Sequence, residues 1–228
     1  MLNQKTIEII LPAYNEEKSI KKYIQGLEKL NIFDKIIVVN NNSTDKTREE
    51  VRMTSAIYLE ENKQGFGAAV KKGLSNITSD LIFISEPDGS FNPSDVPKML
   101  KFIDKYDAVF TSRTNNKMNF YLKFGNKIYG FLISILFGGP ILSDAGSSLR
   151  LIKSNVLKDI VKNLKYDGPE LQMELTINLL QKKIKILEIK VDYENRIGRK
   201  SIYTKNFFSS LKVLFSFSKV VVKKFFRV

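Results

Sequence analysis

The sequence predicts an α/β domain built on a doubly wound, mostly parallel sheet with helices on both faces. Two observations predict it. Several strand-like runs are apolar throughout, which is typical of strands buried on both faces of a sheet. These runs alternate with stretches of helical periodicity, as strand–helix–strand units with right-handed crossovers do. A chain of 228 residues has room for one such domain and is short for two.

The first half of the chain contains the clearest elements. Strands are expected at residues 6–11, 35–39, 57–59 and 81–85, and helices at 19–30, from about 45, and at 68–74. Pro12 is expected to close the first strand. Ser43 or Thr44 is expected to cap the helix that begins near Asp45.

The second half predicts fewer strands and longer helices. We expect a helix after Pro93, a strand at 108–110, a helix at 170–180 and a half-buried strand at 184–191. The apolar segment 118–137 is interrupted by Lys123 and Lys127, which favours a core or interfacial helix over a spanning one.

Polar segments follow three of the expected strands, at residues 12–17, 40–45 and 86–91. Open α/β sheets bind ligands at the carboxyl ends of their strands, so these segments predict a site. Glu86 and Asp88 flank Pro87, which stiffens the spacing between them. Such oxygen ligands suit Mg²⁺ or Mn²⁺ shared with substrate phosphates. Taken alone, an acid-x-acid pair is a weak signal, and a solvated acidic turn is the better interpretation of it.

Two further residues are candidates with an open alternative. Arg113 follows the 108–110 strand and could bind a phosphate, although a surface salt bridge is about equally expected. Asp144 lies among small residues, which suits a close approach to a ligand. A turn or helix-cap aspartate is the commoner use of such a residue.

The composition excludes several classes of site. There is no Cys and no His, which removes disulfides, thiolate or His-ligated metal sites and Ser-His-Asp chemistry. The Gly65-x-Gly67 segment lacks the third glycine of a dinucleotide-binding loop, because position 70 is Val. A formal net charge of +13 indicates polyanions, phosphorylated ligands or an anionic membrane surface as partners. No motif supports nucleic-acid binding.

The last 23 residues form a separate stretch in which aromatic and aliphatic residues alternate with basic ones. This pattern predicts a basic amphipathic helix in the membrane interface. Packing on its own domain, or pairing in a dimer, is the alternative. We therefore divide the chain into a domain at 1–205 and a tail at 206–228. With no signal-like or membrane-spanning run, we expect a cytoplasmic protein peripheral to the inner membrane face.

Six segments, in order along nearly the whole chain, resemble family-2 glycosyltransferases of the GT-A fold, and within them the dolichol/polyprenol-phosphate sugar transferases. The segments are Pro12–Glu17, Val38–Thr47, Gly65–Ala69 with Gly73, Glu86–Gly89, Ser112–Arg113 and Asp144-x-Gly146. Weaker similarities are Glu188 and the stretch from Arg196 to Ser201.

This resemblance implies a nucleotide-sugar donor, inversion at the anomeric carbon and a Mg²⁺ or Mn²⁺ cofactor. It implies a donor site made of Pro12, Tyr14, Glu16, Asn40, Gly65, Glu86 and Arg113. Asp88 would be the metal-coordinating acid of a DxD-like element, with Glu86 in place of its first Asp. Arg113, Arg196 and Lys200 would meet the diphosphate or the acceptor phosphate. Asn40 stands where the family commonly has Asp facing the base, which leaves the base open.

The resemblance also frames the choice of acceptor. A polyprenyl phosphate is already an anion and needs no strong base, which agrees with the absence of His. A sugar hydroxyl would need a base, for which Asp144 is the candidate. The alternatives are transfer to a surface glycan or lipid-linked oligosaccharide, and a non-catalytic, membrane-associated nucleotide-sugar-binding module. The sequence predicts no oligomeric state.

Overall fold

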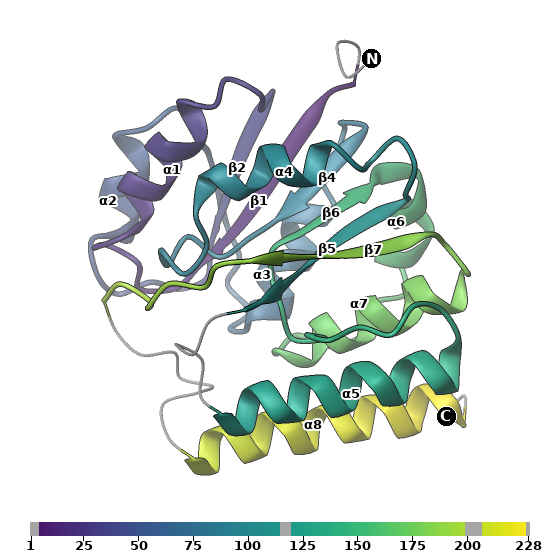
Figure 1. Cartoon of the computed structure of the whole chain (residues 1–228). Coiled ribbons are helices and arrows are strands. Elements are labelled where there is room, and N and C mark those ends of the chain that lie inside the picture. Colours follow the sequence, from purple (N-terminus) through teal and green to yellow (C-terminus); the bar gives the residue numbers. More distant parts are fainter. Residues whose placement is uncertain (1–4, 115–119, 199–206, 227–228) are drawn as a thin grey trace.

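The structure is a computed structural model, and it describes residues 5–114, 120–198 and 207–226. These residues contain a seven-stranded sheet with helices on both faces (Figure 1). The strand order is β3-β2-β1-β4-β6-β5-β7. β6 runs antiparallel to both of its neighbours, and the other pairs are parallel. The expected mostly parallel sheet is confirmed. The strands are β1 (Ile7–Ala13), β2 (Lys35–Asn40), β3 (Ile57–Glu60), β4 (Leu81–Ile84), β5 (Ala108–Arg113), β6 (Arg150–Lys153) and β7 (Ile186–Val191).

Two apolar cores lie on the two faces of the sheet. Adjacent β1 residues alternate between them, with Ile9 and Leu11 in one core and Ile10 in the other. Helices α1 (Ile20–Glu28), α2 (Thr47–Arg52) and α4 (Val96–Leu100) cover the first face. Helices α3 (Phe66–Leu74), α6 (Ser154–Val161) and α7 (Glu170–Gln181) cover the second. The continuous apolar runs of the strands follow from burial on both sides.

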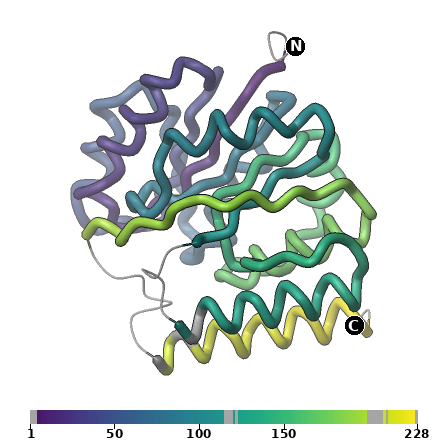
Figure 2. The backbone as a smooth tube through the Cα atoms, viewed as in Figure 1, coloured from purple at the N-terminus to yellow at the C-terminus, as the bar shows by residue number. Residues whose placement is uncertain are grey.

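The long helices α5 (Phe120–Phe137) and α8 (Phe207–Phe225) lie side by side outside α7 (Figures 1 and 2). Phe217, Val220 and Val221 of α8 are buried in the second core. On the same helix, Lys224 Nζ lies 3.2 Å from Glu174 Oε1 of α7. One face of α8 therefore packs on the domain. The predicted boundary between residues 205 and 206 lies outside the described residues. None of the described helices combines the length and apolar character that a membrane crossing needs.

Two local expectations are wrong, for identifiable reasons. β1 does not end before Pro12 but continues to Ala13, paired with β2. Its pairing with β4 ends at Ile10, so the N–H that Pro12 lacks has no strand partner to lose on that side. Neither Ser43 nor Thr44 caps α2, whose Thr47 N–H donates instead to Asp45 Oδ1 at 3.0 Å. The sequence analysis also missed β6 and α6, which follow a loop of small residues.

Candidate active site

The loops after β1 and β2 interlock at the carboxyl edge of the sheet. Asn15, with φ of 57°, donates its N–H to Ser43 Oγ at 3.0 Å, and Thr44 N–H donates to Asn15 Oδ1 at 2.8 Å. Glu16 N–H donates to Thr47 Oγ1 at 2.8 Å. Ser43 therefore holds the neighbouring loop instead of a helix end. These bonds fix the Pro12–Glu17 segment against the 40–47 segment.

A cavity of about 310 Å³ opens beside β2 and β3, with Asn40 among its lining residues. Asn40 is buried, and its Oδ1 has no hydrogen-bond partner among the described residues. A buried acceptor without a partner is costly, so this atom is suited to receive an N–H from a ligand. The other predicted base-binding residues, Pro12, Tyr14 and Glu16, do not line this cavity.

Asn41 organises the loop that carries Gly65. Its Nδ2 donates to Lys63 O at 2.8 Å, and its Oδ1 accepts from Gly65 N–H at 2.6 Å. A Cβ on Gly65 would lie 2.2 Å from Asp167 O, and the φ of Gly65 is +143°. Glycine is therefore required by close packing. The sequence analysis gave Asn41 no role, although it lies in the same polar strand end as Asn40.

Three carboxylates converge on one guanidinium. Arg196 Nη1 donates to Asp88 Oδ2 at 2.9 Å and lies 3.8 Å from Glu86 Oε2. Arg196 Nη2 donates to Glu16 Oε1. Glu16 and Asp88 are buried, and Arg196 comes from the segment after β7. The structure thus brings the predicted metal ligands Glu86 and Asp88 together with Glu16, predicted to bind the nucleotide, and Arg196, predicted to bind a phosphate.

Three carboxyl groups share one guanidinium in this cluster, and burial favours the neutral forms of Glu16 and Glu86. Burial raises the pKa of Glu16 to about 8, against the opposing effect of Arg196. Burial, followed by the charge of Asp88, also raises the pKa of Glu86. Removing charged carboxylates from water favours their neutral form unless a cation compensates. The cluster is therefore suited to receive additional positive charge.

The donor atoms present fit a hard cation. Among the described residues, no group of three or more His, Cys, Asp or Glu side chains is arranged to hold a metal by protein ligands alone. Glu86 and Asp88 nevertheless offer carboxylate oxygens, the ligands that Mg²⁺ and Mn²⁺ take together with substrate phosphates. The residues thus fit a cation that binds with its nucleotide.

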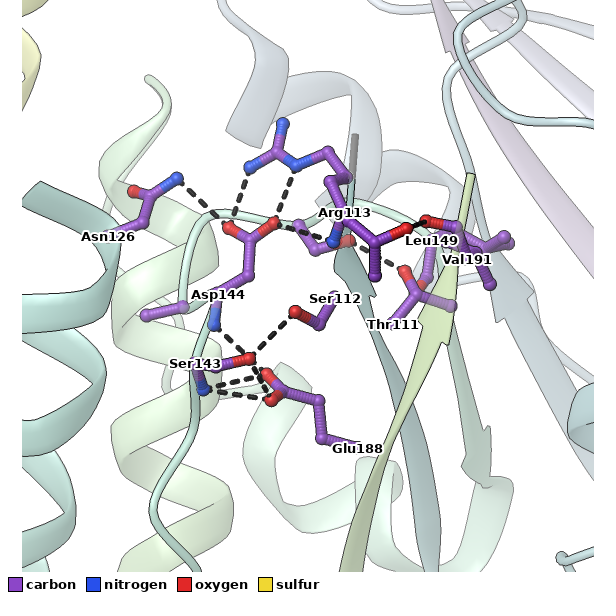
Figure 3. Close-up of polar contacts among 12 residues, drawn as sticks. Thr111, Ser112, Arg113, Asn126, Ser143, Asp144, Leu149, Glu188 and Val191 are labelled. Atoms are coloured by element: carbon purple, nitrogen blue, oxygen red, sulfur yellow. Dashed lines mark hydrogen bonds and ion pairs between the residues drawn. The ribbon is translucent and has the colours of Figure 1, made fainter. Parts of the chain in front are cut away.

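Arg113 and Asp144 form a bidentate ion pair at the end of β5 (Figure 3). Arg113 Nε donates to Asp144 Oδ2 at 2.6 Å and Nη2 to Oδ1 at 2.7 Å. Asn126 Nδ2 of α5 donates to Asp144 Oδ1 at 3.0 Å. Both oxygens of Asp144 therefore accept charge-assisted or amide hydrogen bonds. A general-base role would require Asp144 to give up one of them.

Glu188 holds the Asp144 loop from the other side. It accepts Asp144 N–H at 3.0 Å and Ser143 N–H at 2.8 Å (Figure 3). The buried Arg150 holds the same loop by donating to Ser147 O at 2.9 Å and Ala145 O at 3.0 Å. The sequence analysis missed Arg150, since an arginine that opens a strand carries no visible signal.

Tyr193 lies between the Arg113–Asp144 ion pair and the carboxylate cluster around Arg196. The guanidinium carbon of Arg113 lies 5.2 Å from the ring centroid of Tyr193, three residues before Arg196. Arg113 also lowers the pKa of Glu86 electrostatically, although burial has the larger and opposite effect. Arg113, Asp144 and the carboxylate cluster thus lie along one strand-end edge. Lys200, a predicted phosphate ligand, lies outside the described residues.

The chain is similar to known proteins over most of its length. The profile of glycosyl transferase family 2 matches residues 8–161. A UDP-N-acetylglucosamine–dolichyl-phosphate N-acetylglucosaminyltransferase of Methanococcus voltae is 31% identical over 88% of this chain and 87% of its own length. An uncharacterized protein of Methanocaldococcus jannaschii is 29% identical over 99% of this chain and 95% of its own.

Solved structures show the same fold. Glucosyl-3-phosphoglycerate synthase of Mycobacterium tuberculosis, crystallised with Mg²⁺ and UDP, superposes with a TM-score of 0.77 at 17% identity, over 97% of this chain and 79% of its own. The GT-A fold expected from the sequence is thereby confirmed. Because the family profile covers more than half of the chain, the conclusion extends beyond the fold: this chain belongs to glycosyltransferase family 2, and it is a glycosyltransferase.

Proposed function

We propose that this enzyme transfers a sugar, with inversion, from a nucleotide-sugar donor to a polyprenyl phosphate at a membrane surface. The observation that carries the proposal is an exposed face of α5 and α8 that is both apolar and basic. A hydrogen bond from Asn126 of α5 to Asp144 connects this face to the site at the carboxyl edge of the sheet. The name of the Methanococcus relative, a dolichyl-phosphate sugar transferase, supports the same acceptor class.

The α5–α8 face consists of the exposed apolar side chains of these two helices. They include Phe124, Ile128, Phe131 and Ile135 of α5, and Leu211, Phe215, Val222 and Phe225 of α8. Phe215 is 65% exposed and Ile135 62%. Large exposed apolar patches of this kind mark interaction sites. The opposite face of α8 already packs on the domain, so the exposed face is a surface of the folded enzyme.

Charge favours an anionic lipid surface as the occupant of this face. The exposed lysines are Lys127 on α5 and Lys212, Lys219 and Lys223 on α8, while neither helix contains Asp or Glu. Apolar side chains flanked by lysines bind the boundary between headgroups and acyl chains, and anionic lipids strengthen that binding. We therefore place the enzyme peripherally on the cytoplasmic face of a membrane. The C-terminal helix contributes to this contact together with α5.

The donor is proposed to bind on the β1–β4 side of the edge. Asn40 Oδ1 accepts an N–H of the base, and Glu86 and Asp88 hold the Mg²⁺ or Mn²⁺ that accompanies the diphosphate. The mycobacterial structures with UDP-glucose and Mn²⁺, or with UDP and Mg²⁺, support a nucleotide and a divalent cation as ligands of the shared fold. When bound, the cation supplies Lewis-acid stabilisation of the leaving diphosphate. Arg113 adds positive charge on the other side of the leaving group.

The acceptor phosphate is proposed to attack from the β5–β7 side. An oxygen of the phosphate bonds to the anomeric carbon while the bond from that carbon to the nucleoside diphosphate breaks, and no proton is removed. This chemistry needs no general base. The paired state of Asp144 is compatible with it, since Asp144 then positions Arg113 instead of accepting a proton.

The proposal is tested with a panel of UDP- and GDP-sugars and Mn²⁺ or Mg²⁺, with or without polyprenyl phosphate in phosphatidylglycerol-containing vesicles. Nucleoside diphosphate release is measured. We expect release that requires one donor, the cation and the lipid phosphate. Nucleoside diphosphate release that does not depend on the lipid would favour a glycan as the acceptor. A Haloferax volcanii relative is named as a hexosyltransferase of low-salt glycan biosynthesis. No release with any donor would favour the binding-module alternative.

A further inference from the structure

The carboxylate cluster already contains a cation of its own. Arg196 donates one guanidinium nitrogen to Asp88 Oδ2 at 2.9 Å and the other to Glu16 Oε1, and its Nη1 lies 3.8 Å from Glu86. These carboxylates belong to segments 108 and 180 residues away from Arg196. No local turn forces this contact. It exists because three nearby carboxylates in a largely buried site need a counter-charge.

The second oxygen of Asp88 is also engaged. Asp88 Oδ1 accepts Ser90 N–H at 2.9 Å, within the turn that follows β4. With Oδ2 bonded to Arg196, both oxygens of this carboxylate already have donors. A divalent cation at Oδ2 would lie within a few ångströms of the Arg196 guanidinium, and the two positive charges repel one another, so the Arg196 contact opposes cation binding there.

We propose that Arg196 occupies the position of the divalent cation while the donor site is empty, and that the cation arriving with the nucleotide displaces its guanidinium. Arg196 thus competes with free metal ions and keeps the carboxylates paired until donor is present. This inference rests on the metal part of the proposed function and is independent of the lipid acceptor.

The backbone around Arg196 keeps it near the site after displacement. Ile197 N–H donates to Asp88 O at 2.8 Å, and Glu194 N–H donates to Ser90 O at 2.9 Å. These bonds hold the 194–197 segment against the turn that carries Asp88, whichever way the Arg196 side chain points. The released guanidinium therefore stays within the charged edge, where the diphosphate or the acceptor phosphate can take it as a bidentate partner.

The test measures Mn²⁺ binding to the full-length chain without nucleotide, by electron paramagnetic resonance of the unbound ion. Arg196→Gln removes the internal cation and is expected to bind Mn²⁺ roughly ten- to a hundredfold more tightly than the unaltered protein, the equivalent of one or two charge-assisted hydrogen bonds. Arg196→Lys is expected to fall between them, because a point charge replaces the fork only partly. Arg52→Gln, a change at an exposed arginine on α2, is the matched control and is expected to bind as the unaltered protein does.

Equal Mn²⁺ affinities in the unaltered protein and the Arg196 variants, including no detectable binding by any of them, would overturn the proposal. Weaker binding by Arg196→Gln would do the same, since it would make Arg196 a supporter of the metal site. If Arg196→Gln does not fold, Arg196→Lys decides alone, and an affinity equal to that of the unaltered protein refutes the competition. Lipid-dependent transfer is measured separately, so failure of either hypothesis leaves the other standing.

Discussion

The carboxyl edge of the sheet has a proposed donor half, around β1, β2 and β4, and a proposed acceptor half, around β5 and β7, and the two differ in how their polar groups are paired. Around β1, β2 and β4, three carboxylates share one arginine, and the buried Asn40 Oδ1 has no hydrogen-bond partner in the part of the chain that the structure describes. Around β5 and β7, Arg113 and Asp144 pair in bidentate geometry, and Glu188 holds their loop. The donor half is underpaired and suited to receive a cation and a base. The acceptor half is already ordered and offers a fixed charge.

The two halves differ in their outer surroundings as well. The donor half is bordered by polar loops that bond to one another, such as Asn15 with Ser43. The acceptor half is connected through Asn126 to α5, whose exposed side chains include Phe124, Phe131 and Ile135. Under the proposed function, this difference lets the donor reach its side from solution and the acceptor reach its side from the membrane surface proposed to bind α5 and α8.

The largest effect is expected from Asp88→Asn in the donor half. Loss of the carboxylate charge weakens cation binding and is expected to lower transfer by about a thousandfold or more. The measurement is nucleoside diphosphate release under saturating donor. Asp104→Asn is the matched control, because Asp104 is exposed and pairs only with Lys5 among the described residues. A rate close to that of the unaltered protein would remove Asp88 from the metal site.

Arg113→Lys tests the acceptor half. The change keeps the positive charge but loses the fork that engages both oxygens of Asp144, so transfer is expected to fall about ten- to a hundredfold. Mn²⁺ binding measured separately is expected to stay unchanged, because Arg113 does not contact the Asp88 carboxylate. If Mn²⁺ binding falls as steeply as transfer, the two halves are not separable in the way described above.

The α5–α8 face is tested by the double change Ile135→Ser and Phe215→Ser. Each lost apolar side chain weakens partition into the interface, and together they are expected to reduce vesicle binding by about tenfold or more. Activity toward a water-soluble, short-chain polyprenyl phosphate is expected to remain. Met53→Ser, at an exposed apolar residue at the end of α2, serves as the control. Vesicle binding that survives the double change would locate membrane contact elsewhere.

The smallest effect concerns the protonation of Glu16. Because burial raises its pKa from 4.5 to about 8, the folded chain retains a proton there that the unfolded chain releases. The stability from this proton is full below about pH 4.5 and is lost as the pH rises through about 8. The unfolding free energy of the unaltered protein is expected to fall by about 1 kcal/mol relative to Glu16→Gln between about pH 7 and about pH 8. A constant difference in denaturant titrations would contradict the raised pKa.

The elements that the sequence predicted well are those whose signal is local. β2 and β4 are short, continuously apolar runs that end in polar segments, and both lie where expected. The predicted cap of α2 was wrong because Ser43 accepts a hydrogen bond from Asn15, which belongs to a different loop. β6 was missed because it is only four residues long and follows a loop of small residues, so its sequence shows no clear strand periodicity.

The pairing within the site could not be predicted from the sequence. Glu16, Glu86, Asp88 and Arg196 were all identified as candidates, but their convergence depends on how β1, β4 and the segment after β7 meet in the sheet. The hydrogen bond from Asn126 to Asp144 likewise joins residues 18 apart through a helix whose interior face is set by α7 and α8. Such contacts are consequences of topology, which no single segment encodes.

The most direct test of the central claim is the identity of the product. After incubation with the accepted nucleotide sugar, Mn²⁺ or Mg²⁺, and polyprenyl phosphate in vesicles, the organic phase is analysed by mass spectrometry. We expect one new lipid, heavier than the polyprenyl phosphate by one sugar residue and cleaved by mild acid at the glycosyl phosphate bond. Sugar found only on soluble saccharides, with the lipid phosphate unchanged, would contradict it.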